Sequence, residues 1–235
     1  MGIPLGNLLI VALAQMSDNF LDALDKASAL LGCAARVLPS TVDSVDLEAR
    51  IGEQMAYGQR AIKALSAARG LPIRNLAVTP ATARALPQAV EAILAADVIT
   101  LGPGSLYTSV IPNLLIEGMA EAISQSKAKK IYLCNIMTEA DETDGFSAAD
   151  HVSELLRACP TLQLDYAVFN SLPISAEMQA LYAEEEAMAL EPPNTSLFAF
   201  GDVQFVCKPL ASEARFVRHN PANLARAIFE IYYNA

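Results

Sequence analysis

Four short apolar stretches decide the fold of this chain: IRNLAV (73–78), DVITL (97–101), KIYLCN (130–135) and LDYAVF (164–169). Each is followed by a segment whose apolar residues recur at helical spacing, and these segments cover residues 86–94, 112–125, 147–158 and 175–188. Short strands that alternate with amphipathic helices form right-handed βαβ crossovers, and therefore a parallel sheet. The sequence predicts a three-layer α/β fold with a mostly parallel sheet that has these four strands at its centre.

Two further segments flank this predicted core. Residues 42–58 nearly alternate apolar with polar side chains around a turn at Gly52, so we expect a hairpin at the periphery. The first thirty residues carry two helical patterns, and Asp18 or Asn19 is placed to cap the second. Because no linker-like tract, low-complexity run or repeat interrupts the chain, we expect a single domain over residues 1–235.

The composition narrows the class of protein. A chain of 235 residues is long enough to bury a sizeable core, and 53% apolar with only 18% charged residues excludes intrinsic disorder. Its 16 basic and 26 acidic residues give a formal net charge of −10. Since nucleic acids and anionic membranes attract basic surfaces, neither is expected as a partner.

Two features indicate a cytoplasmic protein. The apolar stretch at residues 8–14 is too short to span a bilayer, and no Lys or Arg precedes it, as a signal peptide would require. The four cysteines lie far apart, without metal-ligand spacing, which is typical of buried reduced thiols: Cys33, Cys134, Cys159 and Cys207.

The loop after the second predicted strand is the first candidate site, because ligands bind beyond the carboxyl ends of parallel strands. It reads GPGSLYTS (102–109), in which two glycines let the backbone approach a ligand and hydroxyl side chains follow. Such a loop suits a phosphate group. A tight turn with capping hydroxyls explains the same residues. The loop matches neither the Walker A motif nor the dinucleotide fingerprint.

The loop after the third predicted strand is acidic. It runs over residues 135–145 and could hold a ribose, a sugar or Mg²⁺. A solvated loop explains it equally, since Ser147 and Asp150 form a capping box for the next helix.

The last candidate positions follow the fourth strand. Asn170 could read a base or a hydroxyl, and Tyr182 could stack on a ring, although a cap and a surface aromatic are the alternatives. Lys208, Arg215 and Arg218 lie close in sequence beside His219, as an anionic ligand would need.

Nothing in the sequence identifies a catalytic residue or a metal site. No G-x-S-x-G, zincin or EF-hand motif is present. His151 begins a helix, where a capping or buried neutral role is expected. The catalytic residues are therefore left unknown, and no metal ligands are predicted.

Several strings closely resemble one family: LGNLL (5–9), LGPGSLYTSVIPNLL (101–115), CNIMT (134–138), ETDGF (142–146) and DHV (150–152). The chain resembles the gluconeogenesis factors (the YvcK-like proteins), which are related in fold to 2-phospho-L-lactate transferase (the CofD-like proteins). The resemblance implies a Rossmann-like fold and a cytoplasmic role in carbon metabolism and cell shape. It also implies a regulator that binds a nucleotide-diphosphate sugar, UDP-linked by preference. The alternative is a transferase that moves a phospholactyl group to or from a guanosine diphospho carrier, with Mg²⁺ as its possible cofactor.

The resemblance also implies a set of ligand-binding positions. Residues 102–109 would hold a diphosphate, Asn135, Thr138 and Asp144 would line the cleft, and Tyr182 and Arg218 match positions tied to UDP-sugar binding. The full set of expected ligand-binding residues, motif positions and strand-end residues together, is Asn7, Gly102, Pro103, Gly104, Ser105, Tyr107, Thr108, Ser109, Asn113, Asn135, Thr138, Asp144, Asn170, Tyr182 and Arg218.

One departure from the family bears on assembly. Family members carry a strand and a glycine-rich loop ahead of the LGN string, whereas this sequence starts almost at that string. The chain is thus expected to be N-terminally truncated relative to the family. Because open sheet edges and apolar patches invite association, we expect a homo-oligomer.

Overall fold

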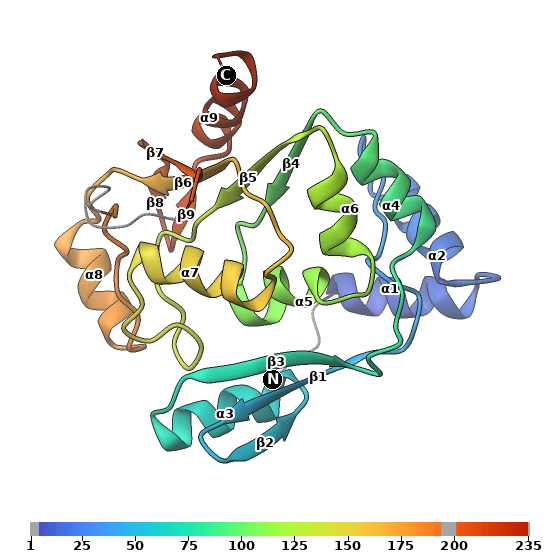
Figure 1. Cartoon of the computed structure of the whole chain (residues 1–235), viewed down its shortest axis with the longest axis horizontal. Helices are drawn as coiled ribbons and strands as arrows, with labels where there is room; N and C mark the ends of the chain where they lie inside the picture. Colours follow the sequence, from blue (N-terminus) through green and yellow to red (C-terminus); the bar gives the residue numbers. More distant parts are fainter. Residues whose placement is uncertain (1–4, 194–200, 235) are drawn as a thin grey trace.

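The computed structural model describes residues 5–193 and 201–234 and is built around a four-stranded parallel sheet (Figure 1). The strands lie in the order β4 (Val98–Leu101), β5 (Lys129–Leu133), β6 (Tyr166–Asn170) and β7 (Gln204–Lys208). All three pairings are parallel. The α/β fold with a parallel sheet is confirmed, and so are three of its four predicted strands.

Helices cover both faces of this sheet. The C-terminal helix α9 (Pro221–Asn234) packs Ala227 and Ile231 against Ile131 and Val168 on one face. The larger core lies on the other face, where α6 (Met119–Gln125) and α7 (Ala148–Ala158) cover the sheet. The side chains of β5 and β6 are almost all buried, which explains their nearly continuous apolar sequences.

The prediction for residues 73–78 is wrong in its pairing. They form β3 (Ile73–Thr79), which pairs antiparallel with β1 (Asp46–Ile51) in a separate sheet of order β2-β1-β3. The predicted hairpin is confirmed, since β1 and β2 (Gln54–Tyr57) pair antiparallel around Gly52. The helix α3 (Gln59–Arg69) packs on this second sheet and was not predicted.

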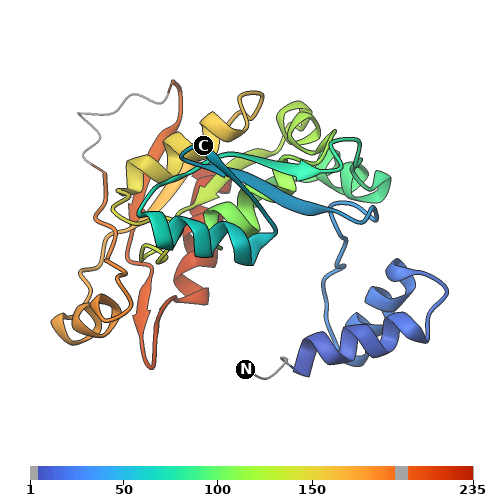
Figure 2. The same cartoon turned by 90° about the horizontal axis from the view of Figure 1, so that it is seen from below.

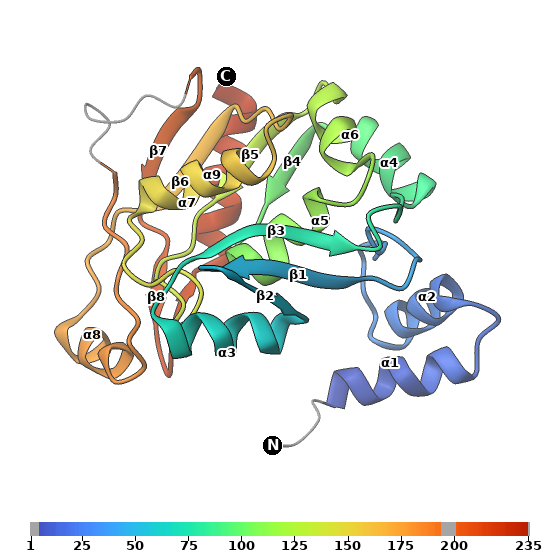
Figure 3. The same ribbon diagram turned by 60° about the horizontal axis from the view of Figure 1, so that its bottom comes forward.

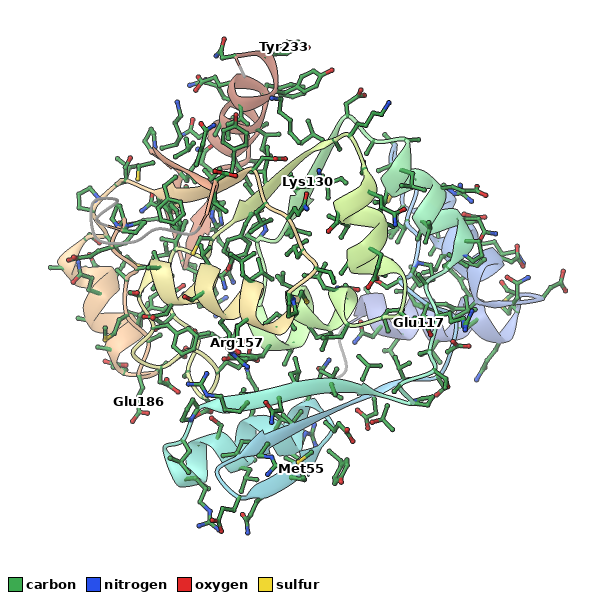
Figure 4. The ribbon with its side chains drawn as sticks, viewed as in Figure 1. Met55, Glu117, Lys130, Arg157, Glu186 and Tyr233 are labelled. Carbon is green, nitrogen blue, oxygen red and sulfur yellow. The ribbon has the colours of Figure 1, made fainter. Side chains whose placement is uncertain are left out.

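The second sheet is joined to the main body across α7. Glu154 on α7 is 4% exposed and accepts hydrogen bonds from Arg157 at 2.9 Å and from Arg74 of β3 at 3.3 Å. Arg157 lies between α7 and β3 (Figure 4). Arg157 belongs to α7 itself, so Arg74 is the residue that joins the second sheet to this buried carboxylate.

The N-terminal helices form a pair set apart from the rest of the chain. Figure 2 shows α1 (Leu5–Gln15) and α2 (Phe20–Leu30) beside each other, connected to the body by residues 31–45. Asn19, one of the two expected caps, accepts a hydrogen bond from the Asp22 amide at 3.0 Å. No side chain of α1 is buried.

The predicted helices differ from the observed ones mainly where glycine or acidic residues intervene. Helix 147–158 is confirmed, with its capping box from Ser147 to Asp150. Helix 112–125 is interrupted by Gly118 at φ +94°, so it divides into α5 (Ile111–Leu114) and α6, after a π-helical turn at Leu106–Val110. Helix 175–188 ends early, as α8 (Ala176–Ala183), because three glutamates follow it and carboxylates are unfavourable at a helix C-terminus.

One helix and one hairpin complete the described elements. They are α4 (Pro87–Leu94), which agrees with the predicted helix over 86–94, and the unpredicted hairpin of β8 (Ala211–Glu213) and β9 (Val217–His219).

Cys134 and Cys159 are buried as expected, whereas Cys33 and Cys207 are exposed, and all four are free thiols. Within the described parts of the chain, no helix is long and apolar enough to cross a membrane.

Candidate functional site

A cleft of about 630 Å³ lies at the carboxyl edge of the parallel sheet. The loops that follow β4 and β5 both reach it, as expected for a fold of this kind. Seven of the predicted ligand-binding residues line it together: Pro103, Gly104, Ser105, Asn135, Thr138, Tyr182 and Arg218. The structure therefore brings three separate sequence motifs to one site.

The two strand-end loops are joined to each other at the cleft. The Gly104 amide donates to Asn135 Oδ1 at 3.2 Å, and Asn135 Nδ2 donates back to the Gly104 carbonyl at 3.1 Å. The Asn135 side chain thus holds the backbone of the loop after β4 in place. Because Gly104 N–H is already engaged, a bound phosphate would have to displace Asn135 or use other donors of this loop.

Thr138 fixes another part of the cleft wall. Its hydroxyl accepts from the Met188 amide at 2.8 Å, and its own amide donates to the Met188 carbonyl at 2.7 Å. This pairing attaches the segment that follows α8 to the loop that follows β5. Ala187 and Tyr182 consequently lie on the wall of the cleft.

One flank of the cleft is formed by α8 and β9. The Tyr182 hydroxyl accepts from the Val217 amide at 3.1 Å and donates to its carbonyl at 3.5 Å. The Arg218 guanidinium lies 5.3 Å from the centre of the Phe216 ring and is therefore oriented by a cation–π contact. Tyr182 thereby holds β9 where Arg218 reaches the cleft.

His219 belongs to this flank and was noted in the sequence only as a neighbour of the cations. Its Nε2 donates to the Cys134 carbonyl at 3.2 Å, which ties β9 to the end of β5. Burial lowers the pKa of His219 below its ordinary value of 6.5, so the ring is neutral at pH 7.

The opposite flank is formed by α3 and contains a residue that sequence reasoning missed. Lys63 Nζ lies 2.8 Å from Glu139 Oε1 and 3.0 Å from Glu142 Oε1. Burial lowers the pKa of Lys63, but hydrogen bonds to the two carboxylates outweigh it, and the pKa is raised overall. The pKa of Glu142 is also raised, first because the carboxylate is buried and second because Glu139 is close. Lys63 and Glu139 line the cleft, and Glu142 lies behind them.

Three of the other predicted residues line a neighbouring pocket of about 340 Å³: Gly102, Ser109 and Asn113. Two more line neither pocket, one of them buried and the other half-buried. Tyr107 is 1% exposed, in the core beside Phe146, and the Thr108 hydroxyl donates to Glu142 at 3.2 Å.

The last three predicted residues lie away from the cleft. Asn7 is exposed on α1, and Asp144 is exposed and accepts from the Asp141 amide at 2.9 Å. Asn170 is 5% exposed, and its side chain binds backbone groups of Leu172, Leu210 and Ala211. In this structure Asn170 acts as a structural residue that links β6 to the chain after β7.

The residues at the cleft do not form a metal site. Across residues 5–193 and 201–234, no group of three or more His, Cys, Asp or Glu side chains could hold a metal ion. Glu139 and Glu142, the nearest pair of carboxylates, are both engaged by Lys63.

The two histidines give a prediction for stability. His151 is fully buried and donates from Nδ1 to the Ser147 carbonyl, and burial lowers its pKa, as it does for His219. Because the unfolded chain binds these protons more readily, the free energy of unfolding should be highest above pH 6.5 and fall as the pH drops below it. Urea unfolding at pH 8, 6.5 and 5.5 measures this. A variant with both histidines replaced by glutamine should lose part of the slope, and an unchanged slope would contradict the prediction.

The fold and the cleft define a Rossmann-like α/β protein with a cleft at the carboxyl ends of its parallel strands. A family model described as "2-phospho-L-lactate transferase CofD" matches residues 2–208, and the chain belongs to this family. Within it, the chain is similar to gluconeogenesis factors. It is 35% identical over 230 residues to the gluconeogenesis factor of Halalkalibacterium halodurans. The match covers 97% of this chain and 70% of that protein.

Two further comparisons agree. A putative gluconeogenesis factor of Clostridium acetobutylicum is 34% identical, and the match covers 96% of this chain but 50% of that protein, so the chain spans about half of this relative's length. The crystal structure of a UPF0052 family member from Bacillus halodurans superposes with a TM-score of 0.90 at 36% identity, over 97% of this chain and 73% of that one.

Proposed function

We propose that this chain binds a nucleotide-diphosphate sugar, UDP-linked by preference, and acts in the cytoplasm as a regulator of carbon metabolism and cell shape. The observation that carries the proposal is the convergence of Gly104–Ser105, Asn135, Tyr182 and Arg218 on one cleft. A volume of about 630 Å³ suits a ligand of this size.

Each part of the ligand has a matching feature in the cleft. The Arg218 guanidinium carries a permanent positive charge for the diphosphate. The loop after β4 adds backbone and hydroxyl donors around Ser105. The Tyr182 ring offers an aromatic face to the base, while its hydroxyl is already engaged by Val217.

The alternative function is a transferase, as the description of the matching family states. It would act on a phosphorylated hydroxy acid and a guanosine diphospho carrier. Calorimetric titration with UDP-glucose, UDP-N-acetylglucosamine and GDP distinguishes the two. Tight binding of GDP with turnover would favour the transferase, whereas binding of a UDP-sugar without turnover supports the regulator.

Arg218→Ala should weaken UDP-sugar binding about ten- to a hundredfold, because one hydrogen bond to a charged oxygen is worth about 1.5–3 kcal/mol. It should also flatten the dependence of the affinity on salt. Arg215→Ala is the matched control, since Arg215 contacts the same Phe216 ring at 5.4 Å but does not line the cleft. Equal effects of the two substitutions in the titration would contradict a specific role for Arg218.

We also propose that the chain associates with itself. Leu5, Leu8 and Val11 of α1 are 82%, 48% and 56% exposed, and no described residue pairs with the outer edge of β4. Apolar helices and open sheet edges of this kind favour association. Light scattering at micromolar concentration should give at least twice the chain mass of 25.0 kDa, and Leu8→Lys combined with Val11→Lys should lower it. A mass of one chain for the unmodified protein would contradict the proposal.

A further inference from the structure

The cleft has two chemically different flanks, separated by the loop that follows β5. Figures 1 and 3 show this loop passing between α8 and α3. Tyr182 and Arg218 line the α8 flank, and Lys63 of α3 lines the opposite flank, where Glu139 of the loop after β5 pairs with it. A ligand that occupies the whole cleft therefore presents different groups to the two sides.

The α3 flank offers both a donor and an acceptor to a ligand. The side chains of Lys63 and Glu139 are 34% and 33% exposed, so a bound molecule can reach them. Two of the three N–H donors of Lys63 have carboxylate partners among the described residues, which leaves the third for a ligand. Glu139 binds Lys63 through Oε1, and its Oε2 has no hydrogen-bond partner in the described part of the chain.

The charge of this flank argues against a phosphate there. One ammonium group and two carboxylates, Glu139 and Glu142, leave a net charge of −1, which repels an anion. The α8 flank contains Arg218 and Glu185, which balance each other, and the hydroxyl and amides near Ser105 are close by. The diphosphate is therefore better placed between Ser105 and Arg218 than beside Lys63.

We infer that Lys63 and Glu139 form the sugar-binding subsite of the cleft, an inference that rests on the proposed function. A sugar ring is neutral and carries adjacent hydroxyls, each of which donates and accepts a hydrogen bond. The free oxygen of Glu139 accepts from one hydroxyl, and the third N–H of Lys63 donates to its neighbour.

Glu142 is a positioning residue in this arrangement. Its side chain is completely buried, it accepts from Lys63 and from the Thr108 hydroxyl, and its Oε2 has no hydrogen-bond partner among the residues that the structure describes. It holds Lys63 from behind, while Thr108 connects it to the loop after β4. The antiparallel sheet with α3 thus contributes to ligand selection through one lysine.

The test compares a nucleotide with and without its sugar. Calorimetry should measure the affinities of UDP-glucose, UDP-N-acetylglucosamine and UDP for the unmodified protein, Lys63→Met and Glu139→Gln. Each substitution should lower the affinity for the UDP-sugars by about tenfold, because one hydrogen bond that involves a charged group is lost. The affinity for UDP should change by less than about twofold.

Two controls separate binding from folding. Arg60 lies one turn earlier on α3, is exposed and does not line the cleft. The substitution Arg60→Met should therefore leave all the affinities unchanged. Lys63→Met combined with Glu142→Gln removes the buried charge together with its partner, and thermal melts should show this variant folded. It should still lose the preference for UDP-sugars.

The outcomes distinguish the two proposals. If the unmodified protein binds neither UDP nor the UDP-sugars, the proposed function fails and this inference fails with it. The sugar subsite is overturned, and the proposed function stands, if the unmodified protein binds these ligands but the two substitutions do not discriminate between them. This is the outcome if Lys63→Met and Glu139→Gln lower the affinity for UDP as much as the affinity for the UDP-sugars, or lower neither affinity.

Discussion

Asn170→Ala should lower the free energy of unfolding by about 1–4 kcal/mol, since it leaves the buried Leu210 amide without its acceptor at about 1–3 kcal/mol, and the half-buried Ala211 amide at a smaller cost because water can reach it. Asn170 Oδ1 accepts from the amides of Leu210 at 3.1 Å and Ala211 at 2.9 Å. Among the described residues, no other side chain accepts a hydrogen bond from these two amides. Urea unfolding monitored by circular dichroism measures the loss.

The same substitution should also reduce ligand binding, although Asn170 does not line the cleft. The bonds to Leu210 and Ala211 fix the start of β8, which pairs with β9 and so places Arg218. Asn170→Asp is the matched control, because it keeps the Oδ1 acceptor, and its protonated carboxyl can still donate to the Leu172 carbonyl that Nδ2 reaches at 2.7 Å, so the comparison is made at acidic pH. It should cost clearly less stability than alanine. Equal losses for the two variants would show that the acceptor is not the important group.

How far the sequence predicts this fold depends on whether a strand is buried on one face or two. The stretches that become β5 and β6 are buried on both faces, so their continuous apolar sequences identified them correctly. β3 has a similar length, but Arg74 and Asn75 are exposed within it. These two polar residues are the signal that it pairs in a one-sided antiparallel sheet.

Edge and hairpin elements were missed for a related reason. β7 has no fully buried residue, and the three-residue strands β8 and β9 are too short to produce a periodic pattern. They depend on pairing and contacts with distant segments, such as the Tyr182 hydroxyl on Val217, and such contacts cannot be read from local periodicity. Arg218 was therefore noted as one of three cations close in sequence and from the resemblance to a family, and not from a predicted strand that would place it at the cleft.

The candidate site also contains residues that the sequence could identify and one that it could not. Residues that follow parallel strands, such as Gly104 and Asn135, could be found because the sheet itself places them. Lys63 could not, because it reaches the cleft only through the packing of α3 and the second sheet. Its partners Glu139 and Glu142 lie 76 and 79 positions further along the chain.

Gly102→Ala should destabilise the protein by about 2–6 kcal/mol, combining a backbone cost of about 1–3 kcal/mol with a steric cost of similar size. Gly102 has φ +80°, which side chains other than glycine's rarely permit. A Cβ atom there would lie 2.9 Å from the Leu133 carbonyl oxygen, a backbone atom that cannot turn away. Urea unfolding again measures the change.

Gly104→Ala is the matched control, two residues further along the same loop. Both glycines stand in the GPGS sequence, so the sequence alone does not show which of them needs a positive φ. In the structure the φ of Gly104 is not positive, and an added Cβ would meet the Ser109 Cβ at 3.4 Å. The loss of stability should therefore be small, while the larger Gly104→Val should reduce ligand binding, because Gly104 lines the cleft. If Gly104→Ala destabilised the protein as much as Gly102→Ala, the whole loop would be needed for folding. If only Gly102→Ala did so, the two glycines would have separate purposes, one for the turn and the other for access of a ligand.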